Sequence, residues 1–337
     1  MQLRAYAGKR LVFIPIGLAT VIVLAFMLVN LLPGDPAGVI AGPAATPQDL
    51  AATRQRLGLD QPLLTRFGDY IGNLLHGDLG SSFYTSRPIT DEIFRFLPAT
   101  LELVGLALIV AAILGVALGT VASYWKGRVA DRAARFLVTI FQSIPDFFLA
   151  LLLIYLLFFK LGQAPAPVGQ LGLLDTPPDH VTGAVLLDAL LAGDLATFRS
   201  AVAHAILPVL ALGIYYSAYF ARSTFATLVP ALESKQVEYA RACGLSEWRV
   251  LGYAFRQART PILTYAGILL AALIGGAAIV ETIFSWGGFG QWAIDSILKL
   301  DLPAIQGFIV FAGLGALLVF TALDIIVAVL DPRVRYE

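Results

Sequence analysis

The sequence has little charge, little cysteine and little histidine. Charged residues make up 14% of its 337 residues, well below the share expected of a soluble domain, while 58% are hydrophobic and the mean hydropathy is +0.80. The single cysteine, Cys243, excludes an internal disulfide, and the three histidines fit no CxxC or HExxH pattern, so no metal site is expected. The formal net charge of zero gives no indication of nucleic-acid binding. The composition is that of a membrane protein.

Motifs of enzyme chemistry are also missing. No GxxxxGK[ST] sequence is present, so the chain itself cannot cradle the phosphates of ATP. No GxSxG sequence appears, and Ser217 is thirteen residues from His204, too far along one apolar run to be adjacent. An intramembrane enzyme is therefore disfavoured, and neither a catalytic residue nor a cofactor is expected in this chain.

Long hydrophobic runs are what the sequence does contain. A bilayer core of about 30 Å needs about 20 apolar residues in a helix, because lipid offers backbone amides no hydrogen-bond partner. The first run is too long for the apolar region of an ordinary signal peptide, so we expect it to be retained. The pattern predicts an all-α integral membrane protein with six transmembrane helices, over residues 11–32, 103–124, 136–159, 201–220, 262–284 and 308–330.

Lysine and arginine are distributed unevenly between the two sides of these runs. Fifteen lie on the side that holds both chain termini and the loop 221–260, and eight lie on the other side. Cytoplasmic loops of membrane proteins carry the excess of basic residues. Both termini and the loop 221–260 are therefore predicted to be cytoplasmic.

The first external segment, residues 33–102, is long enough to fold. Thr46 followed by Pro47 is typical of a helix start, and Gly58 is typical of a helix end. The apolar periodicity of residues 62–76 predicts a second short helix.

The second external loop, residues 160–200, begins rich in proline and glycine and is expected to form an apolar helix near residues 181–191. These boundaries divide the chain into an N-terminal part with the first span (1–32), a small external helical segment (33–102) and a five-helix core with its cytoplasmic tail (103–337).

The cytoplasmic loop 221–260 is polar but reads as helical in both halves. Gly244 can adopt the left-handed conformation that ends a helix, and Ser246 is suited to capping the next one. In the second half, apolar residues recur at near-helical spacing, namely Leu245, Trp248, Leu251 and Phe255. Such an exposed apolar ridge, flanked by arginines, indicates either a helix lying on membrane lipid or a docking element for another protein.

Within this loop, "EYARACG" (238–244) resembles the cytoplasmic signature of bacterial ABC-importer permeases. Other stretches, in the same order, are similar to the dipeptide/oligopeptide branch of that family: "LPGDPA" (32–37), "LGLDQPLLTRFGDY" (57–70), "HGDLGSS" (76–82), "LPATLEL" (97–103), "HAILPVLALG" (204–213), "ETIFSWGGFG" (281–290) and "DPRVR" (331–335). Cys243, Phe225 and Gly287 depart from the residues usual in the branch. The resemblance implies the type I ABC-importer permease architecture in a bacterial inner membrane.

The resemblance also implies that this loop is a coupling helix pair seated in a cleft of an ATP-hydrolysing subunit. Glu238, Ala240 and Gly244 take the signature positions, with Ala240 allowing close approach and Gly244 making the turn. Leu245 and Trp248 are the expected apolar anchors. The predicted coupling residues are Glu238, Ala240, Arg241, Gly244, Leu245, Trp248 and Leu251.

Members of this family work as pairs of related permeases with two ABC ATPase subunits, which bind ATP and Mg, and an external substrate-binding protein. The resemblance implies short peptides as substrate, with nickel chelates, glutathione or another small solute as alternatives. A secondary transporter is a more distant alternative, because it would show inverted repeats or matching broken helices, and none is found.

Three polar residues within the apolar runs are candidates for the pore or its gating. Asp146 either lines the path or bonds backbone freed by Pro145, since an unpaired carboxylate inside a bilayer is costly. His204 and Glu281 are each expected to make a structural or inter-helix hydrogen bond, with a substrate contact as the alternative.

A GxxxG pair, Gly115 and Gly119, lies in the second run. Small residues at this spacing allow two transmembrane helices to approach closely, so a packing contact is predicted there.

Overall fold

The described part of the chain is helical. The computed structural model describes residues 2–31, 34–42 and 44–330; Leu32, Pro33 and the tail motif 331–335 lie outside them. The helices are α1 (Gln2–Leu31), α2 (Pro36–Ala41), α3 (Pro47–Arg56), α4 (Leu63–Leu75), α5 (Ile89–Tyr124), α6 (Val129–Ser143), α7 (Asp146–Leu153) with its π-helical continuation η1 (Ile154–Lys160), α8 (Val185–Leu191), α9 (Leu195–Leu232), α10 (Lys235–Ala242), α11 (Glu247–Ile283), α12 (Phe289–Leu298) and α13 (Leu302–Leu330).

Five of these helices, α1, α5, α9, α11 and α13, are long and apolar enough to cross a membrane. Each covers all or nearly all of one predicted run, and each extends beyond it. α5 has 36 residues and already begins at Ile89, inside the segment predicted to be external, and α11 has 37 residues because it includes the second half of the polar loop. Hydropathy locates the lipid-facing stretch but not the helix ends outside it.

The third predicted run, residues 136–159, is not one straight helix. α6 and α7 are bent by 96° at a break that contains Ile144 and Pro145. Ile144 is extended, with φ −93° and ψ 117°, because the proline ring disfavours a helical conformation in the residue before it. The expectation of a continuous helix here was wrong, and six crossings result only if the bent pair counts as one.

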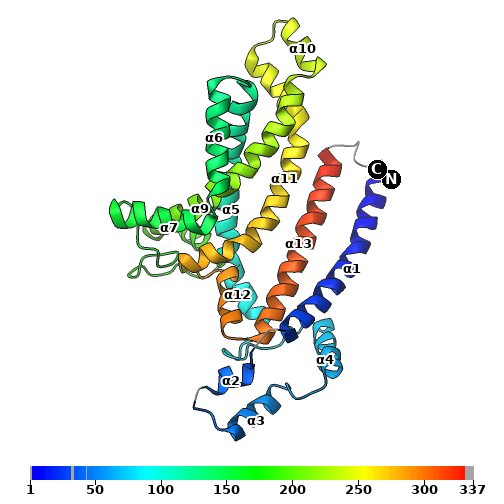
Figure 1. Cartoon of the computed structure of the whole chain (residues 1–337), viewed down its shortest axis with the longest axis vertical. Coiled ribbons are helices and arrows are strands. Elements are labelled where there is room, and N and C mark those ends of the chain that lie inside the picture. Colours follow the sequence, from blue (N-terminus) through cyan, green and yellow to red (C-terminus); the bar gives the residue numbers. More distant parts are fainter. Residues whose placement is uncertain (1, 32–33, 43, 331–337) are drawn as a thin grey trace.

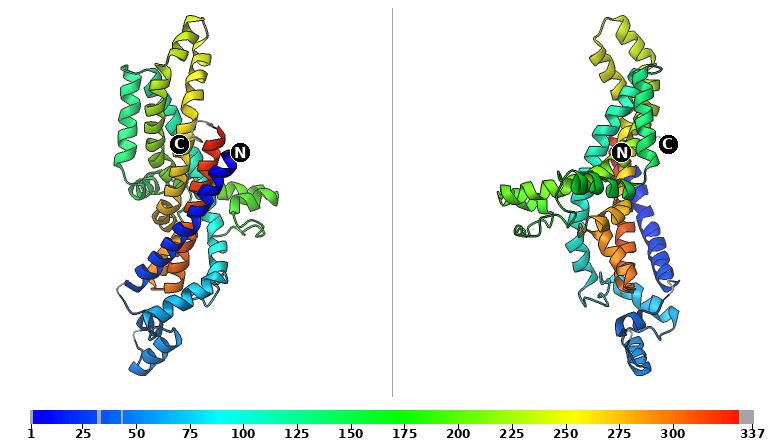
Figure 2. Two further views of the ribbon diagram at one scale, coloured as in Figure 1. Left: turned by 90° about the vertical axis from the view of Figure 1, so that its right-hand side faces the viewer. Right: turned by 60° about the vertical axis from the view of Figure 1, so that its left-hand side comes forward.

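The long helices separate two ends of the molecule (Figures 1 and 2). α10 and the α5–α6 hairpin lie at one end, while α2, α3 and α4 lie at the other. α1 and α13 pack against each other beside a group formed by α5, α9 and α11. The first turn of α1 and the last turn of α13 both point toward the α10 end.

The backbones of α5 and α9 approach each other closely at two glycines. A Cβ atom on Gly115 would lie 2.5 Å from the Ser217 carbonyl oxygen, and one on Gly119 would lie 2.7 Å from that of Ala221. Only glycine lets the two backbones come this close. The packing role predicted for the GxxxG pair is confirmed.

The short helices between α1 and α5 begin as the sequence predicts. Thr46 and Asp49 form a reciprocal capping box at the start of α3. α2 was not predicted; Asp35 caps it and forms an ion pair with Arg54 at 2.8 Å. The hydrogen bond from Arg54 is the main reason why the pKa of Asp35 lies below its ordinary value.

Candidate functional site

The polar loop forms a helix, a turn and a second helix. The Ser234 hydroxyl accepts a hydrogen bond from the Val237 N–H at 3.4 Å and starts α10. Gly244 has φ +76°, the left-handed conformation that the turn requires, and its N–H donates to the Arg241 carbonyl at 2.9 Å. Ser246 stands at the cap position of α11, but its hydroxyl accepts no capping hydrogen bond from the described residues, so its predicted role was wrong.

This loop has a small hydrophobic core of its own, which we call the α9–α10–α11 core. Its buried residues come from all three helices and are Leu228, Ala231, Val237, Ala240, Val250, Ala254 and Ala258. Ala240 is 6% exposed, as expected of a small residue at a close helix contact. The core makes the loop one packed unit with the ends of α9 and α11.

Only part of the predicted apolar ridge is exposed, because the α9–α10–α11 core covers the rest. Leu245, Leu251 and Phe255 pack against the core and are only partly exposed, so they do not form a continuous exposed ridge. Trp248, in contrast, is 84% exposed, and Tyr239 is 72% exposed. A helical periodicity shows which residues share a face, but not whether a neighbouring helix covers that face.

One ion pair joins the two helices of the loop at its exposed surface. Arg241 Nε lies 3.3 Å from the Glu247 carboxylate, which also accepts a hydrogen bond from the Tyr124 hydroxyl at 3.1 Å. Tyr124 ends α5, so the loop is attached to a third long helix. Glu238 is exposed on α10.

Glu281 is completely buried and lies at the other end of α11. Its carboxylate accepts hydrogen bonds from the Thr100 hydroxyl at 2.5 Å and the Gln291 N–H at 2.8 Å. Thr100 in turn accepts one from the Phe289 N–H at 2.7 Å. Glu281 therefore joins α11 to α5 and to the start of α12, which agrees with the predicted inter-helix contact.

The other two candidates lie at different places. Asp146 is the first residue of α7, directly after the bend, and its carboxylate accepts the Phe147 N–H at 2.7 Å. Asp146 was expected to lie within a continuous transmembrane helix, and this expectation was wrong. His204 Nδ1 donates to the Ser200 carbonyl at 2.8 Å, and the Ser200 hydroxyl donates to Asp175. The structure does not bring Asp146, His204 and Glu281 into one hydrogen-bond network among the described residues.

Two buried carboxylates, Glu92 and Asp301, were not predicted from the sequence. Glu92 accepts hydrogen bonds from the Thr85 hydroxyl at 2.6 Å and from the Trp292 indole at 2.9 Å. Asp301 accepts them from the Ser82 hydroxyl at 2.5 Å and the Phe83 N–H at 3.1 Å. An Asp two residues before a proline is a helix-start signal that could have drawn attention to Asp301.

Two family models match the chain. The model described as "Binding-protein-dependent transport system inner membrane component" matches residues 92–336, and a companion model for the N-terminal part of such components matches residues 5–104. The chain belongs to this family. It is a multi-pass inner-membrane component of a transport system, which confirms the predicted permease fold and the prediction that the chain is not an enzyme.

Individual relatives are similar over nearly their whole length. The probable D,D-dipeptide transport system permease protein DdpB of Escherichia coli (strain K12) is 40% identical over 94% of this chain and 93% of the relative. The di/tripeptide transport system permease protein DppB of Pseudomonas aeruginosa (strain UCBPP-PA14) is 38% identical over 94% of each. The glutathione transport system permease protein GsiC of Escherichia coli O6:H1 is 37% identical over 98% of this chain and 99% of the relative.

Proposed function

We propose that this permease forms half of the translocation pore of an ATP-driven importer of short peptides. The other half is a homologous permease, and the complete assembly adds two ABC ATPase subunits and an external substrate-binding protein. The family description, which makes transport dependent on a binding protein, and the names of the peptide-permease relatives support this assignment. The excess of lysine and arginine at the α10 end supports a cytoplasmic position for that end and for both termini.

The α9–α10–α11 core is the observation that carries the coupling role. α9 has 38 residues and α11 has 37, and both run from this core into the membrane-spanning part of the chain. A force applied to α10 therefore acts on two long helices at once, because the buried side chains prevent α10 from moving alone. Closure of the ATPase pair would tilt α9 and α11 as rigid bodies and switch the pore between its two faces.

Trp248 is the proposed anchor in the ATPase. Large exposed aromatic side chains are common centres of protein–protein contacts. Trp248 contributes nothing to the α9–α10–α11 core, so its exposure has no structural explanation within the described chain. Leu245 and Leu251 are proposed to hold the helix of Trp248 in place by packing against the α9–α10–α11 core.

Truncation of this one side chain tests the coupling role. We expect Trp248→Ala to weaken association with the ATPase subunits about 30-fold, the equivalent of about 2 kcal/mol for a central aromatic contact. Leu64→Ala is the matched control, since Leu64 is 85% exposed but lies on α4 at the opposite end. Membrane insertion should be normal in both variants. Equal co-purification of the ATPase with the two variants would refute the docking role.

Glutathione is the second candidate substrate, because the glutathione permease matches 98% of the chain. Glutathione is itself a tripeptide with one γ-linkage, so the two candidates share charged ends and differ in backbone shape. Uptake of labelled dipeptide and of labelled glutathione into vesicles that contain the full assembly separates them. Uphill uptake by this chain without an ATPase would instead indicate a secondary transporter.

A further inference from the structure

A pocket of about 590 Å³ lies between α5, α6 and α9, the three helices that pack together near the α10 end. Half of its wall is apolar and half is polar, and it contains two arginines. The residues that line it, all within the described part of the chain, include no carboxylate: Leu118, Gly119, Ala122, Arg135, Val138, Thr139, Gln142, Ala221, Arg222, Phe225 and Ala226.

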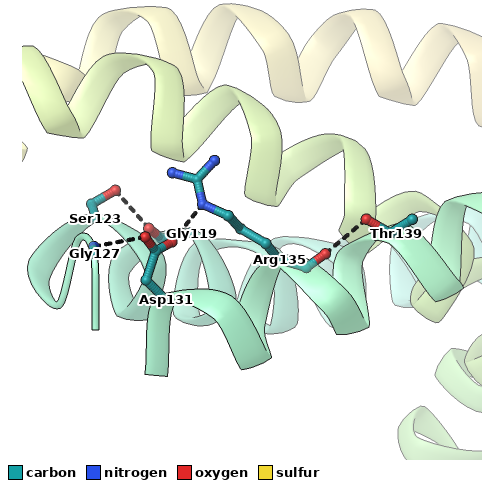
Figure 3. A network of polar contacts seen from close by, with 6 residues as sticks. All are labelled: Gly119, Ser123, Gly127, Asp131, Arg135 and Thr139. Atoms are coloured by element: carbon teal, nitrogen blue, oxygen red, sulfur yellow. Dashed lines mark hydrogen bonds and ion pairs between the residues drawn. The ribbon is translucent and has the colours of Figure 1, made fainter. Parts of the chain in front are cut away.

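Arg135 is fixed in place from two directions. Its Nε donates to Asp131 at 2.5 Å, and Asp131 is held in turn by the Gly127 N–H at 2.9 Å (Figure 3). The guanidinium carbon lies 3.7 Å from the centre of the Phe225 ring. Asp131 contacts only the inner edge of the guanidinium, and both terminal nitrogens lie on the far side (Figure 3). Among the described residues, these two nitrogens have no hydrogen-bond partner.

Arg222 brings a second guanidinium from α9. One of its terminal nitrogens donates to the Gln142 side chain at 2.9 Å, and Gln142 belongs to the last turn of α6. Two guanidinium cations thus line one pocket. A single carboxylate, Asp131, pairs with Arg135, and Asp131 itself does not line the pocket. The remaining positive charge and the unused N–H groups form a preorganised receptor for an anion.

The shape of the pocket indicates what the anion is attached to. A guanidinium fork matches the oxygens of a phosphate group. The apolar wall, including Leu118, Ala122 and Val138, suits the glycerol and first methylene groups of an amphiphile. Anionic phospholipids are concentrated in the cytoplasmic leaflet, the side to which the proposed orientation assigns this end of the molecule.

We propose that this pocket binds the phosphate of an anionic phospholipid headgroup, with Arg135 and Arg222 holding the phosphate. Asp131 and Phe225 are positioning residues, because each contacts the Arg135 guanidinium and orients it. A lipid held here would bridge α6 and α9 next to the coupling loop. Its presence would therefore favour one arrangement of these two helices.

The test is native mass spectrometry of the full chain, purified in detergent and titrated with phosphatidylglycerol, with phosphatidylcholine and with inorganic phosphate. We expect phosphatidylglycerol to bind with a defined stoichiometry, and the variant Arg135→Gln/Arg222→Gln to weaken it about tenfold or more, since charge-assisted hydrogen bonds are lost. Arg128→Gln/Arg132→Gln is the matched control, because both arginines are exposed at the start of α6 and do not line the pocket. The control should change binding less than twofold.

An equal loss of binding in both double variants would overturn the proposal, because it would indicate general charge attraction. Displacement of phosphatidylglycerol by inorganic phosphate alone would overturn the assignment to a lipid and leave a site for a free anion. If Arg135→Gln prevents folding by leaving Asp131 unpaired, Arg222→Gln alone provides the test, since the Arg222 side chain hydrogen-bonds only to the Gln142 side chain among the described residues. Unchanged phosphatidylglycerol binding in that variant would also refute the proposal.

Discussion

The close contact of α5 with α9 makes a sharp prediction about Gly115 and Gly119. We expect the substitution of both glycines by alanine to destabilise the permease, although alanine is the better helix former. The added methyl groups would meet backbone oxygens of α9 at 2.5 and 2.7 Å, where ordinary contact begins at 3.4 Å. The contact of a Cβ atom added at Gly115 with the Ser217 oxygen would lengthen from 2.5 to 3.4 Å only if the two helices moved apart by about 0.9 Å.

The size of the effect follows from two opposing terms. Overpacking of a tight interior costs about 1–3 kcal/mol per site, and the upper half of that range applies because backbone oxygens cannot rotate away as a side chain can. Replacement of glycine by alanine in a helix regains about 1 kcal/mol per site. The two sites share the neighbour Ala221, so their effects are not simply additive. A net loss of about 2–4 kcal/mol is expected for the double variant.

Equilibrium unfolding in mixed micelles, followed by circular dichroism, measures this loss. Gly105→Ala is the matched control on the same helix, since no atom lies within 4 Å of a Cβ atom at Gly105. The control should be as stable as the unaltered protein or slightly more stable. If the double variant unfolds at the same denaturant fraction as Gly105→Ala, the reasoning from the close helix contact is wrong.

Two further predictions concern buried carboxylates. Glu281→Ala leaves the Thr100 hydroxyl and the Gln291 N–H without their acceptor, so we expect a loss of about 2–4 kcal/mol in the same unfolding assay; Glu281→Gln, which keeps an acceptor oxygen, should lose less. Burial acts to raise the pKa of Asp188, but hydrogen bonds from Thr182 and Gly183 outweigh it and hold the pKa below its ordinary value of 3.8. Because the folded-state pKa is depressed, this contribution is present above about pH 4 and is lost as the pH falls through the folded-state value. The protection factor of the Gly183 amide against hydrogen exchange should therefore fall below pH 4, and in Asp188→Asn it should be low at neutral pH as well; a protected amide in that variant would contradict the assignment.

Much of the fold could be predicted from the sequence because lipid imposes a strong constraint on it. Apolar runs of about 20 residues leave helices as the main solution in a bilayer, and the turn at Gly244 follows from local backbone chemistry. The bend at Pro145 was missed because the apolar run continues through it without interruption. Hydropathy carries no information about backbone direction, although the proline itself was a signal.

The candidate site was less predictable because burial depends on partners from elsewhere in the chain. Leu245 and Trp248 belong to the same apolar periodicity in the sequence, yet only Leu245 packs against a hydrophobic core. The groups that donate hydrogen bonds to Glu281 belong to residues 100 and 291, and no local sequence pattern connects these positions. Hydrogen bonds between residues so far apart in the sequence depend on tertiary packing, which cannot be inferred from the pattern of a single sequence.

Helix α11 reaches from the turn after Gly244 to the buried carboxylate of Glu281 at its far end. Its 37 residues correspond to a contour length of about 55 Å. No loop interrupts this helix, so a displacement of its first turn is transmitted along the helix to its last turn. The two ends of α11 are therefore joined by one continuous helix, and each end is held by a side chain that belongs to α5.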